Sequence, residues 1–228
     1  MTYALAAHCR ETGELGAGVA TADIAVGARV PFVEARIGAV LTQHRTDPRL
    51  GPRGIDLLRS GLAAQEALDA LVASTDVARW RQLAIVDATG ATASFSGAEV
   101  VTTRAERHGQ GCVAIGNVLS TPEVCDAMVA AFERAADGPL AERLVRALEA
   151  GRDAGGEQWP ARSSALVVAR DSGMHLVDLR VDESDEPVAA LRALWEAFAP
   201  WVEEFRRRAL DPDAAEGVPR ALREETAT

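Results

Sequence analysis

Pairs of short apolar segments joined by tight polar turns recur along this chain, and they constrain its fold more than any other feature. Residues 3–9 and 15–26 are apolar and β-tolerant, and the polar turn between them, residues 10–14, contains a glycine. A second such pair occupies residues 164–170 and 175–180. Short turns between apolar segments favour antiparallel hairpins, because parallel strands need a long crossover connection. The chain is therefore predicted to form antiparallel sheets.

Helical periodicity appears between the strand pairs. Thr121, Pro122 and Glu123 supply a cap residue, a proline at the first helical position and an early acid, which together predict the start of a helix. The complete predicted order is strands over residues 3–9, 15–26 and 34–43, helices over 52–60 and 63–73, strands over 82–87, 91–95 and 112–116, helices over 122–136 and 139–151, strands over 164–170 and 175–180, and a helix over 187–208. This order favours an α+β fold with helices segregated from the sheets.

The length and composition predict one domain and a tail. A chain of 228 residues can fill one core, so we expect a single domain over residues 1–208. From Asp211 onward the chain is rich in Asp, Glu, Ala, Pro and Arg, and residues 209–228 are expected to be a disordered tail. No apolar stretch approaches the roughly 18 to 20 residues that a membrane span requires, and the N-terminus lacks a signal-peptide pattern. We expect a cytoplasmic protein with no membrane partner.

Composition also excludes several classes of function. The net charge of −10 repels phosphate backbones, so no nucleic-acid partner is expected. All 24 basic residues are arginine, which excludes a Walker-type phosphate loop and any lysine Schiff base. The four histidines and three cysteines lack metal-ligand spacing, and the glycines form no dinucleotide-binding motif between a strand and a helix. No metal and no cofactor are therefore expected.

Several segments resemble, in order and spacing, an uncharacterised bacterial family, the domain of unknown function 1028, of the N-terminal-nucleophile (Ntn) hydrolase-like superfamily. The segments that carry the resemblance are residues 11–16, 26–31, 38–43, 51–54, 81–87, 116–119, 164–168 and 178–182. The resemblance covers residues 2 to about 196. It implies a four-layer α-β-β-α sandwich with two stacked antiparallel sheets. By analogy with the superfamily, it also implies hydrolysis of an amide or other C–N bond in a small-molecule substrate, and it is compatible with a homo-oligomer.

Thr2 is the candidate nucleophile. A small second residue permits removal of Met1, which would leave threonine with a free α-amine. The pKa of such an amine is ordinarily about 7.7 to 8.0, so it can take a proton from the neighbouring hydroxyl. The alternative is structural, because threonine is a common residue at the start of a strand.

Further candidate site residues lie at strand ends or inside the family-like segments. Asn117 is suited to donate an N–H group to a developing oxyanion, and Asp23 could approach the Thr2 amine. Gln43 and His44 end the third predicted strand and are candidates for substrate binding. A guanidinium group suits a substrate carboxylate, and the candidates for that contact are Arg53, Arg162 and Arg180. Each of these residues also has a structural alternative in a turn, a solvated strand end or an ion pair.

Three functions remain open at this point. The first is a hydrolase of a small, carboxylate-bearing metabolite that uses Thr2 as nucleophile. In the second, Asp23 or His44 activates water for hydrolysis or deamination, and Thr2 is structural. The third is a catalytically silent relative that binds a ligand or assembles through its sheets.

Overall fold

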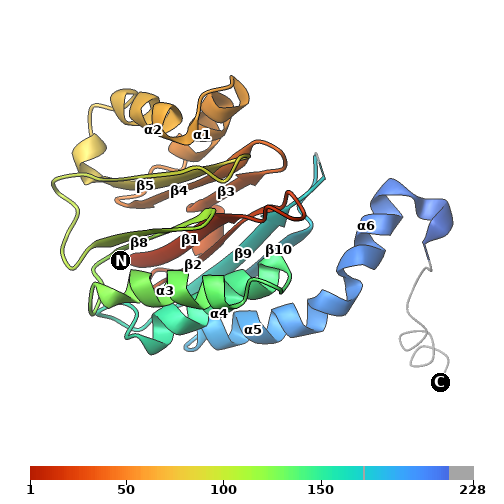
Figure 1. Cartoon of the computed structure of the whole chain (residues 1–228). Coiled ribbons are helices and arrows are strands. Elements are labelled where there is room, and N and C mark those ends of the chain that lie inside the picture. Colours follow the sequence, from red (N-terminus) through yellow and green to blue (C-terminus); the bar gives the residue numbers. More distant parts are fainter. Residues whose placement is uncertain (172, 216–228) are drawn as a thin grey trace. The chain divides into compact units, whose positions relative to one another are not determined.

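The computed structural model describes residues 1–171 and 173–215 (Figure 1). The chain divides into two compact units, residues 1–195 and residues 196–228. The first unit holds both sheets. In the second unit, the described part contains the end of α5 (Pro187–Phe198), a 3-10 helix over Ala199–Trp201, α6 (Val202–Leu210) and a 3-10 helix over Pro212–Ala214.

Two antiparallel sheets form the centre of the first unit. The six-stranded sheet has the order β10-β9-β2-β1-β8-β7, and the four-stranded sheet has the order β3-β4-β5-β6. The strands of both sheets are β1 (Thr2–His8), β2 (Leu15–Thr21), β3 (Pro31–Glu34), β4 (Gly38–His44), β5 (Arg81–Asp87), β6 (Thr92–Ser96), β7 (Ala105–Gly109), β8 (Cys112–Asn117), β9 (Ser163–Ala169) and β10 (Val177–Val181). Every strand pair is antiparallel, as the short turns predict.

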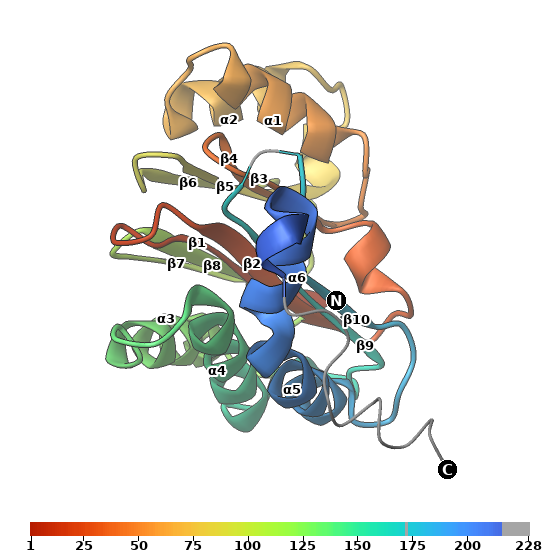
Figure 2. The ribbon, with the colours of Figure 1, turned by 90° about the vertical axis from the view of Figure 1, so that its right-hand side faces the viewer.

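Helices cover the outer face of each sheet (Figures 1 and 2). The helices α1 (Leu50–Arg59) and α2 (Ala64–Ala73) pack on the four-stranded sheet, and α3 (Glu123–Arg134) and α4 (Leu140–Asp153) pack on the six-stranded sheet. The predicted α+β class and the four-layer α-β-β-α sandwich with two stacked antiparallel sheets are therefore confirmed.

The space between the sheets is filled by small and branched apolar side chains. Alternate residues of each strand point inward, so β2 contributes Ala17 and Val19 while β4 contributes Ala39 and Leu41. The glycines of β2 lie on its other face, against α4. A Cβ atom on Gly16 would lie 2.8 Å from Leu144 Cδ1, which shows how closely α4 approaches the sheet.

Four local predictions differ from the structure. The strand predicted over residues 15–26 ends at Thr21, and a 3-10 helix over Val26–Ala28 follows. The strand predicted over residues 34–43 is a hairpin of β3 and β4, whose turn contains Arg36 in the left-handed region with φ 66°. The strand β7 is an unpredicted partner of β8, because its charged residues 105–109 lack an apolar pattern. The helix predicted over 187–208 is interrupted at Pro200, which has no N–H group to continue the helical hydrogen bonds.

The predicted boundary at residue 208 lies inside the second unit, which begins at Glu196. Of the predicted disordered tail over residues 209–228, residues 216–228 lie outside the described residues.

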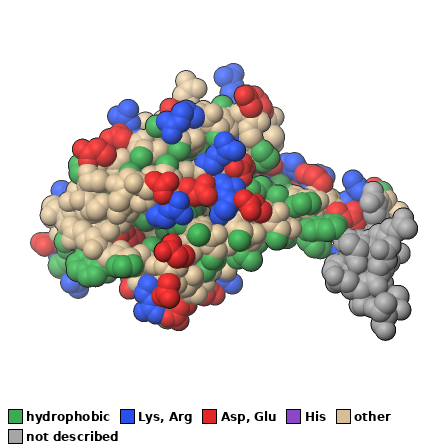
Figure 3. Space-filling model, turned by 90° about the horizontal axis from the view of Figure 1, so that it is seen from below, with side chains coloured by type: hydrophobic (Ala, Val, Ile, Leu, Met, Phe, Trp, Pro, Cys, Tyr) green, Lys and Arg blue, Asp and Glu red, His purple; other side chains and the backbone are tan. Residues whose placement is uncertain are grey.

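The face seen in Figure 3 carries acidic and basic side chains side by side. On α4 the guanidinium of Arg146 donates to Glu142 at 2.6 Å, and Arg152 pairs with Asp153 at 2.8 Å. Within residues 1–171 and 173–215, no helix combines the length and the apolar character needed to cross a bilayer.

Candidate functional site

A row of polar side chains crosses four neighbouring strands at one end of the six-stranded sheet. Cross-strand pairing places Ser163 on β9 beside Thr21 on β2, and Thr2 on β1 beside Asn117 on β8. The hydroxyl oxygens of Thr2 and Thr21 lie 3.3 Å apart, which joins the two pairs into one row. All four polar residues are buried, and the next residues on the same face of these strands are apolar. The apolar interior thus ends in polar groups at this edge.

A second polar row faces the first from the four-stranded sheet. Gln43 on β4 pairs with Gln82 on β5, and Gln82 pairs with Ser96 on β6. The Gln82 Oε1 atom accepts from Gln43 Nε2 at 2.7 Å and from Asn117 Nδ2 at 3.0 Å. Gln82 Nε2 in turn donates to the Gly116 carbonyl at 2.9 Å. These bonds connect the two sheets and fix the side chain of Asn117.

The Thr2 hydroxyl lies where the two rows meet. Its oxygen contacts the Met1 carbonyl oxygen, and the Thr21 hydroxyl donates to that same carbonyl. The Gln43 amide donates to the Thr2 carbonyl at 3.4 Å. The side chain and the backbone of Thr2 are therefore both held by neighbours that lie within this end of the sandwich.

The loop after β2 carries Asp23 to the rim of the site. Ser163 Oγ donates to the Asp23 carbonyl at 2.7 Å and accepts from the Val26 N–H at 3.1 Å, which holds the loop against β9. The Asp23 N–H donates to Thr21 Oγ1 at 3.5 Å. The Asp23 carboxylate itself is exposed to solvent, so it lies beside Thr2 and Thr21 without being enclosed.

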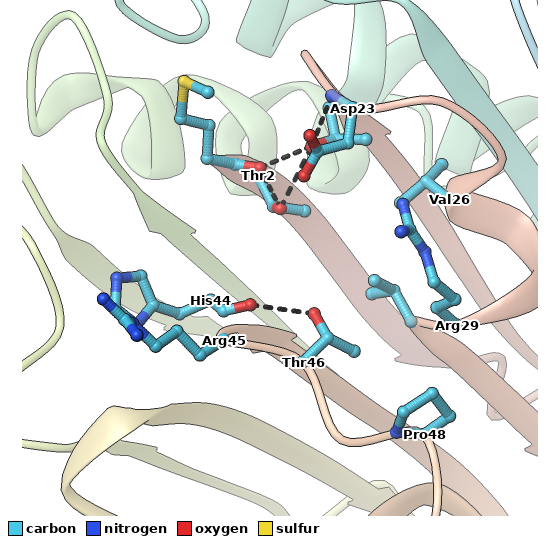
Figure 4. A pocket seen from close by; sticks show the side chains of 11 residues that line it. Thr2, Asp23, Val26, Arg29, His44, Arg45, Thr46 and Pro48 are labelled. Atoms are coloured by element: carbon cyan, nitrogen blue, oxygen red, sulfur yellow. Dashed lines mark hydrogen bonds between the residues drawn. The ribbon is translucent and has the colours of Figure 1, made fainter.

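A cavity of about 400 Å³ opens at this end, and Thr2, Thr21 and Asp23 line it together with Arg29, Arg45 and Thr46. Figure 4 shows Thr2 and Asp23 across the cavity from His44, Arg45 and Thr46. The Arg29 Nη2 atom donates to the Ile24 carbonyl at 2.6 Å, and the Arg45 guanidinium lies 4.1 Å from the centre of the Trp80 ring. The cavity is large enough for a small ligand, and two arginines contribute to its lining.

His44 ends β4 beside the cavity, but both of its ring nitrogens are occupied. The Val101 N–H donates to Nε2 at 3.3 Å, so the neutral ring carries its proton on Nδ1, which donates to the Trp80 carbonyl at 2.8 Å. Burial lowers the pKa of His44, and the nearby amino terminus, Arg45 and Arg81 lower it further, against the opposing effect of the bond to Trp80. This geometry suits a structural histidine better than a general base.

Glu157 is a buried carboxylate next to this end of the sheet. Its Oε2 atom accepts from the Ala22 N–H at 2.9 Å, while Oε1 is buried and has no hydrogen-bond partner within residues 1–171 and 173–215. Burial raises the pKa of Glu157 to about 8, although the Ala22 N–H and the positive amino terminus lower it. Asp23 acts in the same direction as burial.

The three arginines predicted to bind substrate lie outside the cavity lining. Arg53 is on α1, where it donates to the Ser74 carbonyl at 3.1 Å. Arg162 pairs with Glu183 through its exposed guanidinium, and Arg180 lies on β10 with its Cδ against Gly27. The structure thus brings Thr2, Asp23 and His44 to the cavity lining and places Asn117 and Gln43 next to Thr2 in the buried interior, whereas these arginines lie elsewhere.

Sequence reasoning missed Glu157, Gln82 and Ser163. Gln82 and Ser163 had a usable signal, since each is a polar residue near the end of a continuous apolar strand. Glu157 had none, because it lies in a loop between Gly156 and Gln158 and reaches the site only through the fold. No group of three or more potential metal ligands occurs within the described ranges, 1–171 and 173–215.

Comparison with known proteins gives one family and several similar solved structures. Residues 2–191 match the model of "Family of unknown function (DUF1028)". The crystal structure of protein SPO2555 from Silicibacter pomeroyi, assigned to the same family, is similar with a TM-score of 0.82 and 29% identity over 89% of this chain and 90% of that one. The ancestral β-subunit Anbu from Yersinia bercovieri aligns with a TM-score of 0.40 and 12% identity over 88% of this chain and 96% of that one. No curated protein matches the chain.

Proposed function

Because this chain belongs to the family of unknown function DUF1028, we propose its function from its own site: it is a hydrolase of an amide or other C–N bond in a small, carboxylate-bearing metabolite, with Thr2 as nucleophile. The observation that supports this most is the position of the Thr2 hydroxyl. It is buried at the meeting point of two polar rows and lines a cavity of ligand size. A threonine that only began a strand would need neither the buried partner hydroxyl nor the amide network.

The proposed reaction begins when Met1 is removed. The free α-amine takes the proton of the Thr2 hydroxyl, and Oγ1 attacks the carbonyl carbon of the substrate. The C–N bond then breaks, and the α-ammonium returns its proton to the leaving amine. A water molecule repeats the sequence on the acyl-threonine ester, which releases the acid and restores the hydroxyl. Removal of Met1 would also free the room that its carbonyl now occupies beside Thr2 and Thr21.

Asn117 is the proposed oxyanion donor. Its Nδ2 atom has two N–H groups, and one of them donates to Gln82 Oε1. The other is proposed to bind the oxygen that becomes negative when Oγ1 attacks. Since Gln82 also accepts from Gln43, the orientation of the Asn117 amide is set before a substrate arrives.

The substrate is proposed to carry a carboxylate because two arginines line the cavity. Arg29 and Arg45 lie apart from each other in Figure 4, and a guanidinium group is suited to a carboxylate or another planar anion. They take the role that the sequence assigned to Arg53, Arg162 and Arg180. Gln43 stays in the proposal as a positioning residue, because its amide holds the Thr2 carbonyl.

The test combines intact mass with a product assay. We expect the purified, untagged protein to lack one methionine and to hydrolyse members of a panel of N-acyl amino acids and small amides. Thr2→Ala should abolish product formation without changing the melting temperature by more than a few degrees. Thr92→Ala is the matched control, because it removes a hydroxyl at the other end of the four-stranded sheet, where it bonds His108 at 2.7 Å.

Each other outcome selects a different function. Retention of Met1 in the active protein would contradict the nucleophile. Product formation by Thr2→Ala that is lost in Asp23→Asn would indicate water activation. Thermal stabilisation by a compound without any product would indicate a ligand-binding protein.

A further inference from the structure

We propose that Glu157 is the acid–base partner of the Thr2 α-amine: its carboxylate pairs with the ammonium and takes the proton that the amine must lose before it can activate the hydroxyl. This inference rests on the proposed function and adds a residue from a loop that the sequence did not single out. It assigns Glu157 a positioning and proton-holding role, since Glu157 acts through the amine of Thr2.

The fold places Glu157 next to the start of β1. Tyr3 pairs with Ala20, and the contact between the Thr2 and Thr21 hydroxyls extends that alignment by one residue. One further step sets residue 1 opposite Ala22, whose N–H group donates to Glu157 Oε2 at 2.9 Å. The carboxylate is therefore bound to the backbone unit that faces the start of the chain.

The segment that carries Glu157 is itself fixed. Glu157 forms an isolated β-bridge with Leu119, just after β8. The Ser120 N–H donates to the Gly156 carbonyl at 3.0 Å, and the Gln158 N–H donates to the Val118 carbonyl at 3.0 Å. These backbone bonds fix the position of the Glu157 carboxylate, as a role in positioning the amine requires.

Unpaired acceptors around this point indicate that a donor belongs there. Glu157 is 8% exposed, and its Oε1 atom is buried without a partner among the described residues. The other two buried oxygens in that condition are Gln43 Oε1 and Asn117 Oδ1, whose side chains flank Thr2. A buried acceptor without a donor costs about 1–3 kcal/mol, so such atoms are rare in folded proteins. An α-ammonium at Thr2 would bring three N–H donors to the start of β1, between Ala22, which binds Glu157, and the side chains that flank Thr2.

The charges around Glu157 favour a shared proton. The groups that face it are the amino terminus, Asp23 from the loop after β2, and Tyr3 from β1. Burial raises the pKa of the Tyr3 hydroxyl, so Tyr3 stays neutral, and Arg152 and Asp153, which pair with each other, have smaller and opposite effects on that pKa. Burial also raises the pKa of Glu157 to about 8, close to the 7.7 to 8.0 that is ordinary for an α-amine. Groups with matched pKa values can exchange a proton near neutral pH at little cost.

The absence of lysine makes a direct experiment possible. The α-amine is the single amine of the chain, so an amine-selective reagent reports on it alone. The protein and its variants are prepared to begin at Thr2 by specific cleavage of an N-terminal fusion. Trace acetylation by acetic anhydride is then measured from pH 5 to pH 10 against a free reference amine, with the acetylated N-terminal peptide quantified by mass spectrometry.

Glu157→Gln keeps the shape of the side chain and removes its charge. We expect the amine of this variant to titrate at lower pH. The difference should open as pH rises through about 8, where the Glu157 carboxylate of the unchanged protein becomes charged and stabilises the ammonium. A pKa difference of one unit would make acetylation there up to about tenfold faster in the variant. Glu157→Asp, which keeps the charge on a shorter side chain, should lie between the two. Glu14→Gln is the matched control, since Glu14 is equally buried at the other end of β2.

Superimposable profiles for Glu157→Gln and the unchanged protein would overturn the inference, as would an equal shift in Glu14→Gln. The outcome is separate from the proposed function, because acetylation needs no substrate. A profile that shifts as expected in a protein that hydrolyses nothing would leave the Glu157 pairing in place and reject the hydrolase. Hydrolysis that depends on Thr2, together with an unshifted acetylation profile, would support the hydrolase and reject the Glu157 pairing.

Discussion

The hydroxyl oxygens of Thr2 and Thr21 lie 3.3 Å apart on adjacent strands, and the two residues are only 5% and 2% exposed to solvent. Apolar side chains fill the same face of both strands beyond this pair. A hydroxyl pair in such surroundings is ordered, because both oxygens contact the Met1 carbonyl and Thr21 Oγ1 also accepts from the Asp23 N–H. If Thr2 attacks a substrate, Thr21 decides the direction in which its lone pairs point.

Replacement of Thr21 should therefore affect turnover more than stability. Thr21→Val keeps the branched shape and removes the hydroxyl, and we expect kcat to fall about tenfold to hundredfold through misorientation of Thr2. Thr21→Ser should keep most of the activity. Steady-state kinetics on the hydrolysed compound measures both variants, and wild-type turnover in Thr21→Val would show that the pair has no role in catalysis.

Asn117 is expected to act on the transition state. Asn117→Ala should lower kcat about 100-fold to 1,000-fold with little change in KM, because an oxyanion donor binds charge that the ground state lacks. Asn117→Asp, which keeps the size but has no N–H group, should lose as much. An increase in KM at constant kcat would instead assign Asn117 to substrate binding.

The stability of the chain that carries Met1 should depend on pH through Glu157. The folded pKa is raised to about 8 from an ordinary 4.5, so the folded state holds the proton where the unfolded state has lost it. Stability from this group is complete below about pH 4.5, declines as pH rises, and is lost above about pH 8.

Urea unfolding at pH 5, 7 and 9 measures this dependence. Glu157→Gln should remove the decline, so that its advantage over the unchanged protein grows with pH to a few kcal/mol. Parallel pH profiles for the two proteins would show that the carboxylate is not protonated in the fold.

The two glycines of β2 should differ in tolerance. A Cβ atom on Gly16 would lie 2.8 Å from Leu144 Cδ1 and 2.9 Å from the Val167 carbonyl oxygen, and the second neighbour is backbone. Gly16→Ala should thus cost about 1–3 kcal/mol of unfolding free energy. At Gly18 the nearest atom is Leu148 Cδ1 at 3.2 Å, so Gly18→Ala should cost less. Equal costs in chemical denaturation would contradict this account.

The antiparallel sheets could be predicted from the sequence because tight turns and alternation are local signals. The hairpin of β1 and β2 and the helices α1 to α4 follow from such signals. The pairing of β1 with β8 and of β2 with β9 does not, since it joins residues about 110 to 150 positions apart. That long-range pairing builds the row from Ser163 to Asn117.

The candidate site could be predicted only where its residues end predicted strands. Asp23, Gln43 and Asn117 were singled out on that basis and Thr2 because it follows Met1, and the structure brings them together. Arg29 and Arg45 lie in loops whose course the pattern of apolar residues does not determine. Arg53, Arg162 and Arg180 were chosen from segments that resemble the family, and sequence order contains no information on which way a guanidinium points.

The alternation of glycine with larger residues on β2 also bears on how the protein reaches its folded state. Ala17, Val19 and Thr21 face the other sheet, while Gly16 and Gly18 leave room for α4. If β2 paired one residue out of alignment, each side chain would move to the opposite face. Valine and threonine would then meet α4, and glycine would leave holes between the sheets. A one-residue shift of β2 is thus unfavourable on both faces of the strand. The packing that selects the correct pairing also places the Thr21 hydroxyl next to Thr2.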